Sequence, residues 1–417
     1  MISADNIRTT LARQLPEHEG LLRDLMAIPS VSGAEQDAMA FLEAAAARLG
    51  VSVERVALSD DLLEDPEYSD PVPGLRYDGR FNLRLRRAGT GGGPTLLVNA
   101  HVDVVPPSEG MTAWSPEVRN RVVYGRGACD AKGQIAAVLL ALSALDALQA
   151  SLAGDIVVHL VVEEENGGNG TLAMVRRGER ADACVVVEPS DGRLYTSVRG
   201  AVWFRLTLRG RAGHSGTAGE TRSALLLARD AMAILEEYHA HLLRSSRGIE
   251  LFDPYPNPMP LTFGRIEAGN WPASAPSRAT LEGVLGLLPN KSRHEVCEEV
   301  RRTLMDRADG FRPEEFDLHF TYRHDSSVLD PGHELPRTLL RSGQSVGRPL
   351  TVAGMTASCD AWFYNNLLHI PTVVYGPGSL RSAHSAEEHL ALDDLADAAA
   401  VLTHFAMAYC ASPGDAP

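Results

Sequence analysis

Short runs of apolar, largely β-branched residues constrain the fold of this chain most strongly. Turn residues bound each run, and the runs cover residues 94–105, 154–162, 181–188 and 370–376. Because these runs are apolar on both faces, they predict strands that are buried on both sides. Residues 21–28, 37–50 and 135–148 have the apolar spacing of helices instead. The alternation predicts an α/β fold, with a mostly parallel sheet flanked by helices.

The middle of the chain has a different pattern, in which the expected strands alternate apolar with polar residues. Such alternation is typical of a half-exposed antiparallel sheet. The expected elements are a strand at 202–210, a helix at 221–238, strands at 260–269 and 277–288, a helix at 292–305 and a strand at 316–322. This βαββαβ order is the ferredoxin-like, split-βαβ arrangement. We therefore expect residues 199–322 to form an inserted α+β domain, within a discontinuous domain of residues 1–198 and 323–417.

Composition narrows the classes of partner. The 417-residue chain has a formal net charge of −15, which argues against nucleic acid and anionic membranes as partners. Its five cysteines are scattered without CxxC spacing, and residues 1–20 lack the apolar core of a signal peptide. The apolar stretch 135–148 is shorter than the roughly 18 residues that a membrane span needs. These features predict a cytoplasmic protein with reduced thiols.

Residues of the types that bind metals follow the apolar runs, where strands should end. They are His101 and Asp103 after the first run, Glu163 to Glu165 after the second, Glu188 after the third and His384 after the fourth, with Asp130 in a glycine-rich turn. Ligands of open α/β sheets bind beyond the carboxyl ends of the strands. Each residue alone is more often structural, but the repeated pattern predicts a metal cluster at one rim of the sheet.

Two local spacings refine this prediction. Side chains at i and i+2 share a face of a strand, so Asp103 is placed to accept the second imidazole N–H of His101. In a strict strand Glu163 and Glu165 would share one face, and Glu164 would lie on the other. A bend at residues 166–168 would instead bring two neighbouring glutamates to one site. The spacing alone leaves both arrangements open.

Six ordered motifs resemble the di-zinc aminoacylase and carboxypeptidase superfamily, and most closely its acetylornithine deacetylase and succinyl-diaminopimelate desuccinylase branch. They are HVDVV from residue 101, GRGACDAKG from 125, EEENGGNGT from 163, EPS from 188, GRAGHSG from 210, and YGPG from 375 followed by AHSAEEH from 383. Each motif is weak alone, whereas their order along nearly the whole chain is specific. The resemblance implies a zinc-peptidase-like catalytic domain, with the inserted domain as a lid and dimerisation unit.

The resemblance also implies a ligand for each metal ion. Asp130 would bridge two zinc ions, for which cobalt or manganese can substitute. His101 and Glu188 would complete one site, and Glu165 and His384 would complete the other. The peptide bond after Asp130 would be cis, as in relatives.

Further residues would carry the chemistry. Glu164 would act as the general base, which takes a proton from the attacking water and delivers it to the leaving amine, while Asp103 supports the metal-binding histidine. Glu163 receives no catalytic task. His214 would donate to the oxyanion of a neighbouring subunit. We expect a homodimer formed through the inserted domain, by edge-to-edge pairing of strand 202–210 with its copy.

Candidates for holding a substrate carboxylate come from the lid and the GPG loop. They are Asn270, Arg278, Gly376 and Gly378. Many relatives carry an arginine near Val284 and another at the position of Trp362, and the loss of both predicts a changed carboxylate pocket. Cys129 and Cys359 each precede an aspartate, where a packed small residue is more common than a thiolate ligand.

These features together predict a metal-dependent amidohydrolase that removes an N-acyl group, of acetyl or succinyl type, from an amino acid or a related small amine. The main alternative is a dipeptidase or carboxypeptidase that uses the same site. A dinuclear phosphoesterase would need phosphate-directed basic residues or glycine-rich anion loops at the rim, and none is clearly placed there. A catalytically dead binding protein is disfavoured because the set of expected metal ligands is complete.

Overall fold

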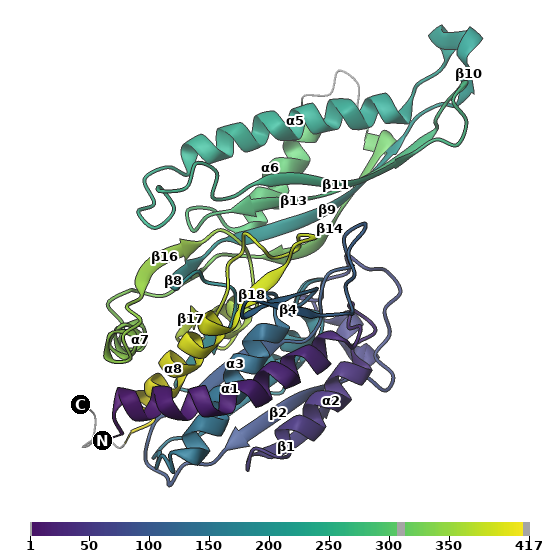
Figure 1. Cartoon of the computed structure of the whole chain (residues 1–417). Helices are drawn as coiled ribbons and strands as arrows, with labels where there is room; N and C mark the ends of the chain where they lie inside the picture. The colour runs from purple at the N-terminus through teal and green to yellow at the C-terminus, as the bar shows by residue number, and fades with distance from the viewer. Residues whose placement is uncertain (1, 307–312, 412–417) are drawn as a thin grey trace.

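The computed structural model describes residues 2–306 and 313–411. Figure 1 shows a main body, which holds both ends of the described chain, and above it a smaller part built from β9 (Gly200–Arg209) to β14 (Phe316–His324). We call this smaller part the lid. None of the described helices is both long and apolar enough to cross a membrane.

The main body is built on a nine-stranded sheet with the order β1-β2-β6-β3-β7-β17-β8-β15, and β16 pairs with β8 beside this path. Its strands are β1 (Ser52–Ala57), β2 (Phe81–Arg87), β3 (Leu96–His101), β6 (Ile156–Val161), β7 (Ala183–Val186), β8 (Arg193–Val198), β15 (Ser327–Val328), β16 (Thr351–Met355) and β17 (Thr372–Val374). The central pairs β6·β3, β3·β7 and β7·β17 are parallel, whereas β1 and β2 form an antiparallel edge. Every residue of β3, β6 and β7 is buried, which confirms the predicted two-sided burial.

Helices cover both faces of this sheet. They are α1 (Ala4–Met26), α2 (Gln36–Ala46), α3 (Lys132–Ala147), α4 (Asn169–Arg176), α7 (Glu334–Ser345) and α8 (Leu392–Tyr409). Val98 of β3 faces apolar residues of α3 and α8, and α1 packs on these two helices. The next residue, Asn99, points to the other face, where it donates to Thr171 of α4 and to Tyr364 of the π-helical turn η4 (Phe363–Leu367). The predicted α/β class is therefore confirmed.

The lid has its own sheet and its own apolar core. Its sheet has the order β11-β13-β9-β14, with β11 (Leu261–Ala268) and β13 (Arg278–Leu287), and all its pairs are antiparallel. Helices α5 (Ala224–Ser245) and α6 (Arg293–Asp306) cover one face, where alternate residues of β9 such as Phe204 are buried. The other face points toward the main body (Figure 1). The predicted βαββαβ order is confirmed.

One expectation about the lid is wrong. Strand β9 pairs with β13 on one side and β14 on the other, so its backbone groups are not free to pair with a copy. The edge strands are β11 and β14, and the residues of β11 are mostly exposed. The alternating pattern of residues 202–210 arises because one face of β9 lies in the lid core and the other points toward the main body, and such a pattern does not distinguish a central strand from an edge strand.

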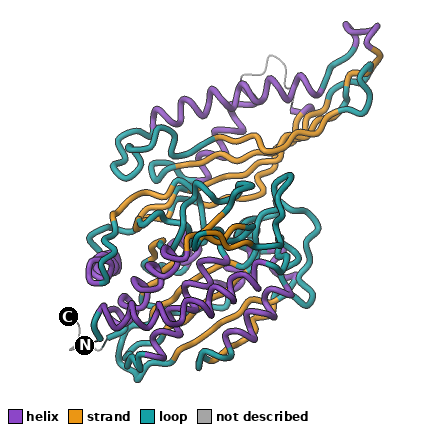
Figure 2. The backbone as a smooth tube through the Cα atoms, in the orientation of Figure 1, coloured by secondary structure: helices purple, strands orange, loops and turns teal. Residues whose placement is uncertain are grey.

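The lid ends in a narrow projection, which we call the lid tip and define as residues 210–221 and 269–277. It contains the short strands β10 (Gly213–His214) and β12 (Ser274–Ala275), which pair with each other, and the turn η2 (Ser215–Glu220). The long strands of the lid run out toward this tip, which lies far from the main body (Figures 1 and 2). The tip residues are therefore remote from the carboxyl ends of β3, β6 and β7 in the same chain.

The lid and the main body are joined by two crossings that lie side by side. Arg199 is the one residue between β8 and β9, and residues 325–326 join β14 to β15. A Cβ atom on Gly200 would lie 2.5 Å from the carbonyl oxygen of His324, so glycine is needed for the two crossings to pack this closely. The remaining elements are β4 (Glu117–Arg119), β5 (Val122–Tyr124) and β18 (His389–Ala391), which form a small sheet, and the turns η1 (Asp60–Glu64) and η3 (Pro313–Glu315).

Candidate active site

The ends of neighbouring strands bring the predicted metal ligands together. His101 is the last residue of β3, Glu188 follows the adjacent strand β7, and Asp130 precedes α3. His384 reaches the same place from the loop between β17 and β18. The ligand atoms of His101, Asp130 and Glu188 lie within 4.8 Å of one another, and so do those of Asp130, Glu165 and His384. The two groups share Asp130, which is the arrangement expected of a bridging carboxylate.

The individual distances show how Asp130 lies between the two histidines. One carboxylate oxygen, Oδ1, is 3.1 Å from Nε2 of His101, and the other, Oδ2, is 3.3 Å from Nε2 of His384. Glu188 lies 3.7 Å from Nε2 of His101, and Glu165 lies 3.1 Å from Nε2 of His384. Each imidazole therefore directs its Nε2 atom at a pair of carboxylates, as a metal-ligating imidazole does.

Asp103 supports the site differently from the prediction. The backbone carbonyl of Asp103 accepts from Nδ1 of His101 at 3.0 Å, whereas its carboxylate is 3.5 Å away from that atom. The carboxylate instead accepts the backbone N–H groups of Glu164 and Glu165 at 3.0 and 3.1 Å. Asp103 thus fixes the tautomer of His101 through its main chain and fixes the glutamate run through its side chain.

The glutamate run lies in a turn beyond the end of β6, so strand alternation does not apply to it. Strand β6 ends at Val161, and Glu163 has a φ of 63°, in the left-handed region. This conformation turns the chain so that Glu164 and Glu165 both line the pocket described below, while Glu163 is fully buried behind them. The second of the two arrangements left open by the sequence is therefore the one that forms.

Glu163 is held by a buried cation rather than by the metal-ligand cluster. Arg80 forms an ion pair with Glu163 and also donates to both carboxylate oxygens of Glu35 at 2.9 Å. Tyr77 and Asn169 each donate to Glu163 at 2.9 Å. We call Glu35, Arg80 and Glu163 the buried brace. It fixes the turn from behind, and sequence reasoning missed it because its members are far apart along the chain.

The turn that carries Asp130 is fixed by a second carboxylate. Glu388 accepts the backbone N–H groups of Cys129 and Asp130, each at 3.0 Å, and is paired with the buried Arg126. The peptide bond between Asp130 and Ala131 is cis, as predicted. The thiol of Cys129 donates to the carbonyl of Ser379 at 3.3 Å, and burial raises its pKa to about 12. This supports a packing role for Cys129 rather than a thiolate ligand.

The buried carboxylates of the cluster need additional positive charge nearby to be stable in their ionised form. Burial raises the pKa of the Glu164 carboxyl well above its usual value, despite the lowering effect of His101. Burial likewise raises the pKa of Glu188, and the neighbouring carboxylates of Asp130 and Glu165 add to that effect. Buried carboxylates at these separations are stabilised in their charged form when a cation binds between them. Two histidines and three carboxylates are also a suitable donor set for divalent zinc, so the residues fit two ions.

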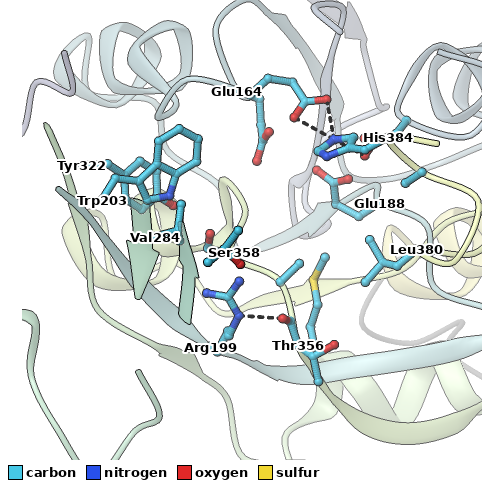
Figure 3. Close-up of a pocket in the computed structure, with 16 residues that line it drawn as sticks. Glu164, Glu188, Arg199, Trp203, Val284, Tyr322, Thr356, Ser358, Leu380 and His384 are labelled. Atoms are coloured by element: carbon cyan, nitrogen blue, oxygen red, sulfur yellow. Dashed lines mark hydrogen bonds and ion pairs between the residues drawn. The ribbon is translucent and has the colours of Figure 1, made fainter. Parts of the chain in front are cut away.

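A pocket of about 410 Å³ opens in front of this cluster, between the main body and the lid (Figure 3). On one side lie Glu164, Glu188 and His384, and on the other lie Trp203, Val284 and Tyr322 of the lid sheet. Glu165, which pairs with His384, also lines the pocket. The remaining wall includes Arg199, Thr262, Met355, Thr356, Ala357, Ser358, Leu380 and Ala383. The pocket thus has a charged side formed by the main body and a largely apolar side formed by the lid.

Arg199 is a pocket residue that sequence reasoning missed. Its guanidinium is buried and donates to the carbonyl oxygens of Thr356 and Gly200, at 2.6 and 3.1 Å. Within the described part of the chain Arg199 forms no ion pair, and burial lowers its pKa to about 10. A buried cation without a carboxylate partner, at the wall of a pocket, is suited to bind an anionic ligand. The signal in the sequence was a lone arginine between two apolar strand runs, at 193–198 and 200–209.

Three predicted residues lie together at or beside the lid tip and not on this pocket. His214 and Asn270 are exposed tip residues, and Arg278 is the exposed first residue of β13. None of the three lines the pocket of its own chain. Their predicted contacts with substrate therefore remain predictions that need a second copy of the chain.

The GPG loop packs behind the cluster. Gly376 and Gly378 line a separate hollow of about 60 Å³, and a Cβ atom on Gly376 would lie 2.8 Å from the carbonyl oxygen of Glu188. Val284 does line the main pocket, but Trp362 does not, because its ring is buried and stacks on His324 at a centroid distance of 4.3 Å. Cys359 is buried next to these residues. The one arginine of the pocket is thus Arg199, which is at neither of the two positions where many relatives carry an arginine.

Comparison with known proteins shows which family the chain matches. The family described as "Peptidase family M20/M25/M40" matches residues 97–408. The chain is 26% identical to the N-formyl-4-amino-5-aminomethyl-2-methylpyrimidine deformylase of Bacillus subtilis, over 80% of this chain and 84% of the relative. It is 29% identical to the succinyl-diaminopimelate desuccinylase of Methylobacterium radiotolerans, over 90% of this chain and 92% of the relative.

A solved structure gives the same fold. A Bacillus subtilis protein, described as a dinuclear metal-binding peptidase from family M20, superposes with a TM-score of 0.63 at 16% identity, covering 95% of this chain and 98% of that one. The family match alone includes all the residues of both metal-ligand groups. The chain therefore belongs to peptidase family M20/M25/M40.

Proposed function

We propose that this protein removes an N-acyl group, of formyl, acetyl or succinyl type, from an amino acid or a related small amine that carries a carboxylate. The observation that carries the proposal is the pair of metal-ligand groups that share Asp130, with Glu164 at the same pocket. Family membership makes the chain a hydrolase of amide bonds, and its deformylase and desuccinylase relatives are both N-deacylases by name. A dipeptidase or carboxypeptidase activity at the same site is the second candidate, because the family is named for peptidases.

Each residue of the cluster has a defined task in this proposal. His101, Asp130 and Glu188 would hold one zinc ion, and Asp130, Glu165 and His384 would hold the other. When bound, the ions supply Lewis-acid polarisation of the amide carbonyl and make the attacking water more acidic. Glu164 accepts the proton of that water at its carboxylate and delivers it to the leaving nitrogen. Its raised pKa suits a group that must both accept and release a proton.

Arg199 supports the choice of a substrate that carries a carboxylate. It is the only lysine or arginine among the residues that line the pocket, and it lacks an ion-pair partner within the described chain. A planar guanidinium accepts one carboxylate in a bidentate geometry. A single arginine is a poorer match for the doubly charged phosphate of a phosphoesterase substrate, which favours the amide hydrolase over that alternative.

We place His214 in the active site of a second copy of the chain. Its ring nitrogen Nδ1 accepts the backbone N–H of Gly216 at 3.0 Å, so Nε2 carries the proton of the neutral ring and is a donor. The tip that presents it projects away from the main body (Figure 1). The free edge strand β11 and exposed apolar residues of the lid, among them Ile266 and Trp271, support a homodimer formed through the lid. The cytoplasm remains the proposed compartment, and all five cysteines are free.

A metal and substrate screen tests the proposal. We expect about two transition-metal ions per chain and loss of activity on treatment with a chelator, restored by zinc, cobalt or manganese. Purified enzyme is then assayed on N-formyl, N-acetyl and N-succinyl amino acids beside dipeptides, with the matching amino-acid amides as controls that lack the carboxylate. A folded, fully active preparation without transition metal would contradict the metal assignment. Faster cleavage of dipeptides than of every N-acyl amino acid would favour the peptidase.

A further inference from the structure

A second hollow adjoins the pocket on the lid sheet, and nothing in the proposed reaction uses it. Its volume is about 190 Å³, and it shares Trp203, Thr262 and Val284 with the main pocket. The shared residues form a wall of both spaces, which are therefore neighbours. The indole of Trp203 lies across the main pocket from His384 in Figure 3, so a group that is joined to the scissile amide and passes this indole would reach the hollow.

The hollow is open at a glycine in a β-bulge of the lid sheet. The register of β11 on β13 shifts between Phe263 and Arg265, which leaves Gly264 as the extra residue of a β-bulge. A Cβ atom at Gly264 would meet no atom within 4 Å, so the space in front of it is open. Gly283 also lines the hollow, but a Cβ atom there would lie 2.6 Å from the ring of Phe204, so this ring takes the place of a side chain. The floor of the hollow is thus backbone and aromatic carbon.

The charges around the hollow are already neutralised. Glu282 accepts from Arg205 at 2.6 Å and from Arg265 at 3.2 Å, and Arg265 is also paired with Glu267. The other lining residues are Pro71, Trp203, Phe204, Thr262, Gly264, Gly283, Val284 and Thr321, which carry no charge. A charged ligand would have to compete with these ion pairs, whereas an apolar group gains contact without displacing them.

We propose that this hollow is a specificity subsite for an uncharged apolar group of the substrate, about the size of a phenyl ring or a branched alkyl chain. The size follows from its volume, since an apolar cavity of about 150 Å³ binds benzene. The inference rests on the proposed function, because it places the scissile amide at the cluster and the substrate carboxylate at Arg199. The preferred substrate is then an N-acyl amino acid with an aromatic or branched substituent, on either its acyl or its amine side.

Gly264→Leu tests the subsite, because the new side chain would fill the open space at the bulge. The substrates are N-acetylglycine, N-benzoylglycine and N-acetylphenylalanine, measured as kcat/KM. In the wild type at least one aromatic compound should be cleaved about 10-fold or more faster than N-acetylglycine. In Gly264→Leu that ratio should fall to near one, and Gly264→Ala should give an intermediate ratio. If the ratio falls for N-benzoylglycine, the acyl group occupies the hollow. If it falls for N-acetylphenylalanine, the substituent on the amine side occupies it.

Gly20→Leu in α1 is the matched control, since its Cβ position is also open and lies outside both hollows. Its ratios should equal those of the wild type. Sedimentation and metal content are measured for every variant, because Gly264 is on the edge strand β11. An unchanged ratio in a metal-loaded Gly264→Leu of wild-type assembly state overturns the subsite. Absence of any cleavage contradicts the proposed function instead. The subsite is then tested by calorimetry. N-benzoylglycine should bind the wild type more tightly than N-acetylglycine does, and this difference in affinity should be lost in Gly264→Leu.

Discussion

Two buried arginines lie on opposite sides of the active site and have opposite surroundings. Arg80, 3% exposed, lies behind the glutamate turn between the carboxylates of Glu35 and Glu163. Arg199, 8% exposed, lies in the pocket and donates only to backbone carbonyls. Burying a charge without a counter-charge is costly, so a protein retains it only where something else offsets that cost. The paired arginine is therefore structural, and the unpaired one is suited to bind a ligand.

The same contrast divides the three consecutive glutamates. Glu163 belongs to the buried brace, whereas Glu164 and Glu165 line the pocket. Paired groups should affect folding when they are replaced, and unpaired groups should affect metal binding or catalysis. Three predictions follow, beginning with the largest expected effect, and the first and the last of them test this division.

Glu164→Gln should reduce the rate by about 10²–10⁴-fold, because an amide cannot move the proton of the attacking water. Its metal content should equal that of the wild type, since Glu164 is in neither metal-ligand group. Glu165→Gln should lower metal occupancy as well as the rate. Metal analysis of the two purified variants beside their kcat measures this difference. Exchanged phenotypes would mean that the roles of the two neighbours are reversed.

His214→Ala should reduce turnover by about 10²–10³-fold, the usual loss for one oxyanion donor, while the protein stays dimeric and metal-loaded. Subunits of this variant are then exchanged with subunits of Glu164→Ala. If His214 acts on the neighbouring subunit, each heterodimer has one site with both lesions and one intact site. Heterodimers should show about half of the wild-type activity, and a randomly exchanged mixture about a quarter. Verified exchange without recovery would place His214 in the site of its own chain.

Replacing each buried arginine by methionine gives the smallest expected effect on the reaction and the most direct test of the comparison. Arg199→Met should lower kcat/KM for substrates with a carboxylate by about 10–100-fold, as expected from the loss of a charged hydrogen bond, and should leave the matching amides nearly unaffected. Arg80→Met should instead lower the free energy of unfolding by about 3–5 kcal/mol, because it leaves buried carboxylates unpaired. Denaturant unfolding and steady-state kinetics on both variants check this. A comparable loss of stability in both variants would show that Arg80 and Arg199 do not differ as structural and ligand-binding residues.

The fold, and the gathering of histidines and carboxylates at one rim of its sheet, were predictable because both depend on local patterns in the sequence. The assignment of each residue to a metal ion came from the family resemblance instead. His101 and Glu188 end or follow apolar runs, and the carboxyl ends of parallel strands meet by geometry. What the sequence could not supply depends on contacts between distant segments. The left-handed turn at Glu163 and its pairing with Arg80, 83 residues away in sequence, are of this kind. So is the central position of β9, which depends on strands that follow it in the chain.

The pocket wall was predicted less well for a related reason. Arg199 follows an apolar run, and a pattern of apolar residues does not show whether an isolated arginine points into a cavity or away from it. Trp362 was expected at the substrate and is instead stacked on His324 at the base of the lid. Gly264 carried no signal, since only the register of two strands identifies it as a bulge.

The position of Arg199 between β8 and β9 has a consequence for the motion of the lid. Its guanidinium bonds to Thr356 in the main body and to Gly200 in the lid, so it spans the junction through which any rotation of the lid must pass. A carboxylate bound there adds contacts at that junction and narrows the range of angles between the two parts. The affinity for substrate and the angle between the lid and the main body are then thermodynamically linked. A substitution that restricts the lid to one angle changes the affinity for substrate by the same factor by which bound substrate favours that angle.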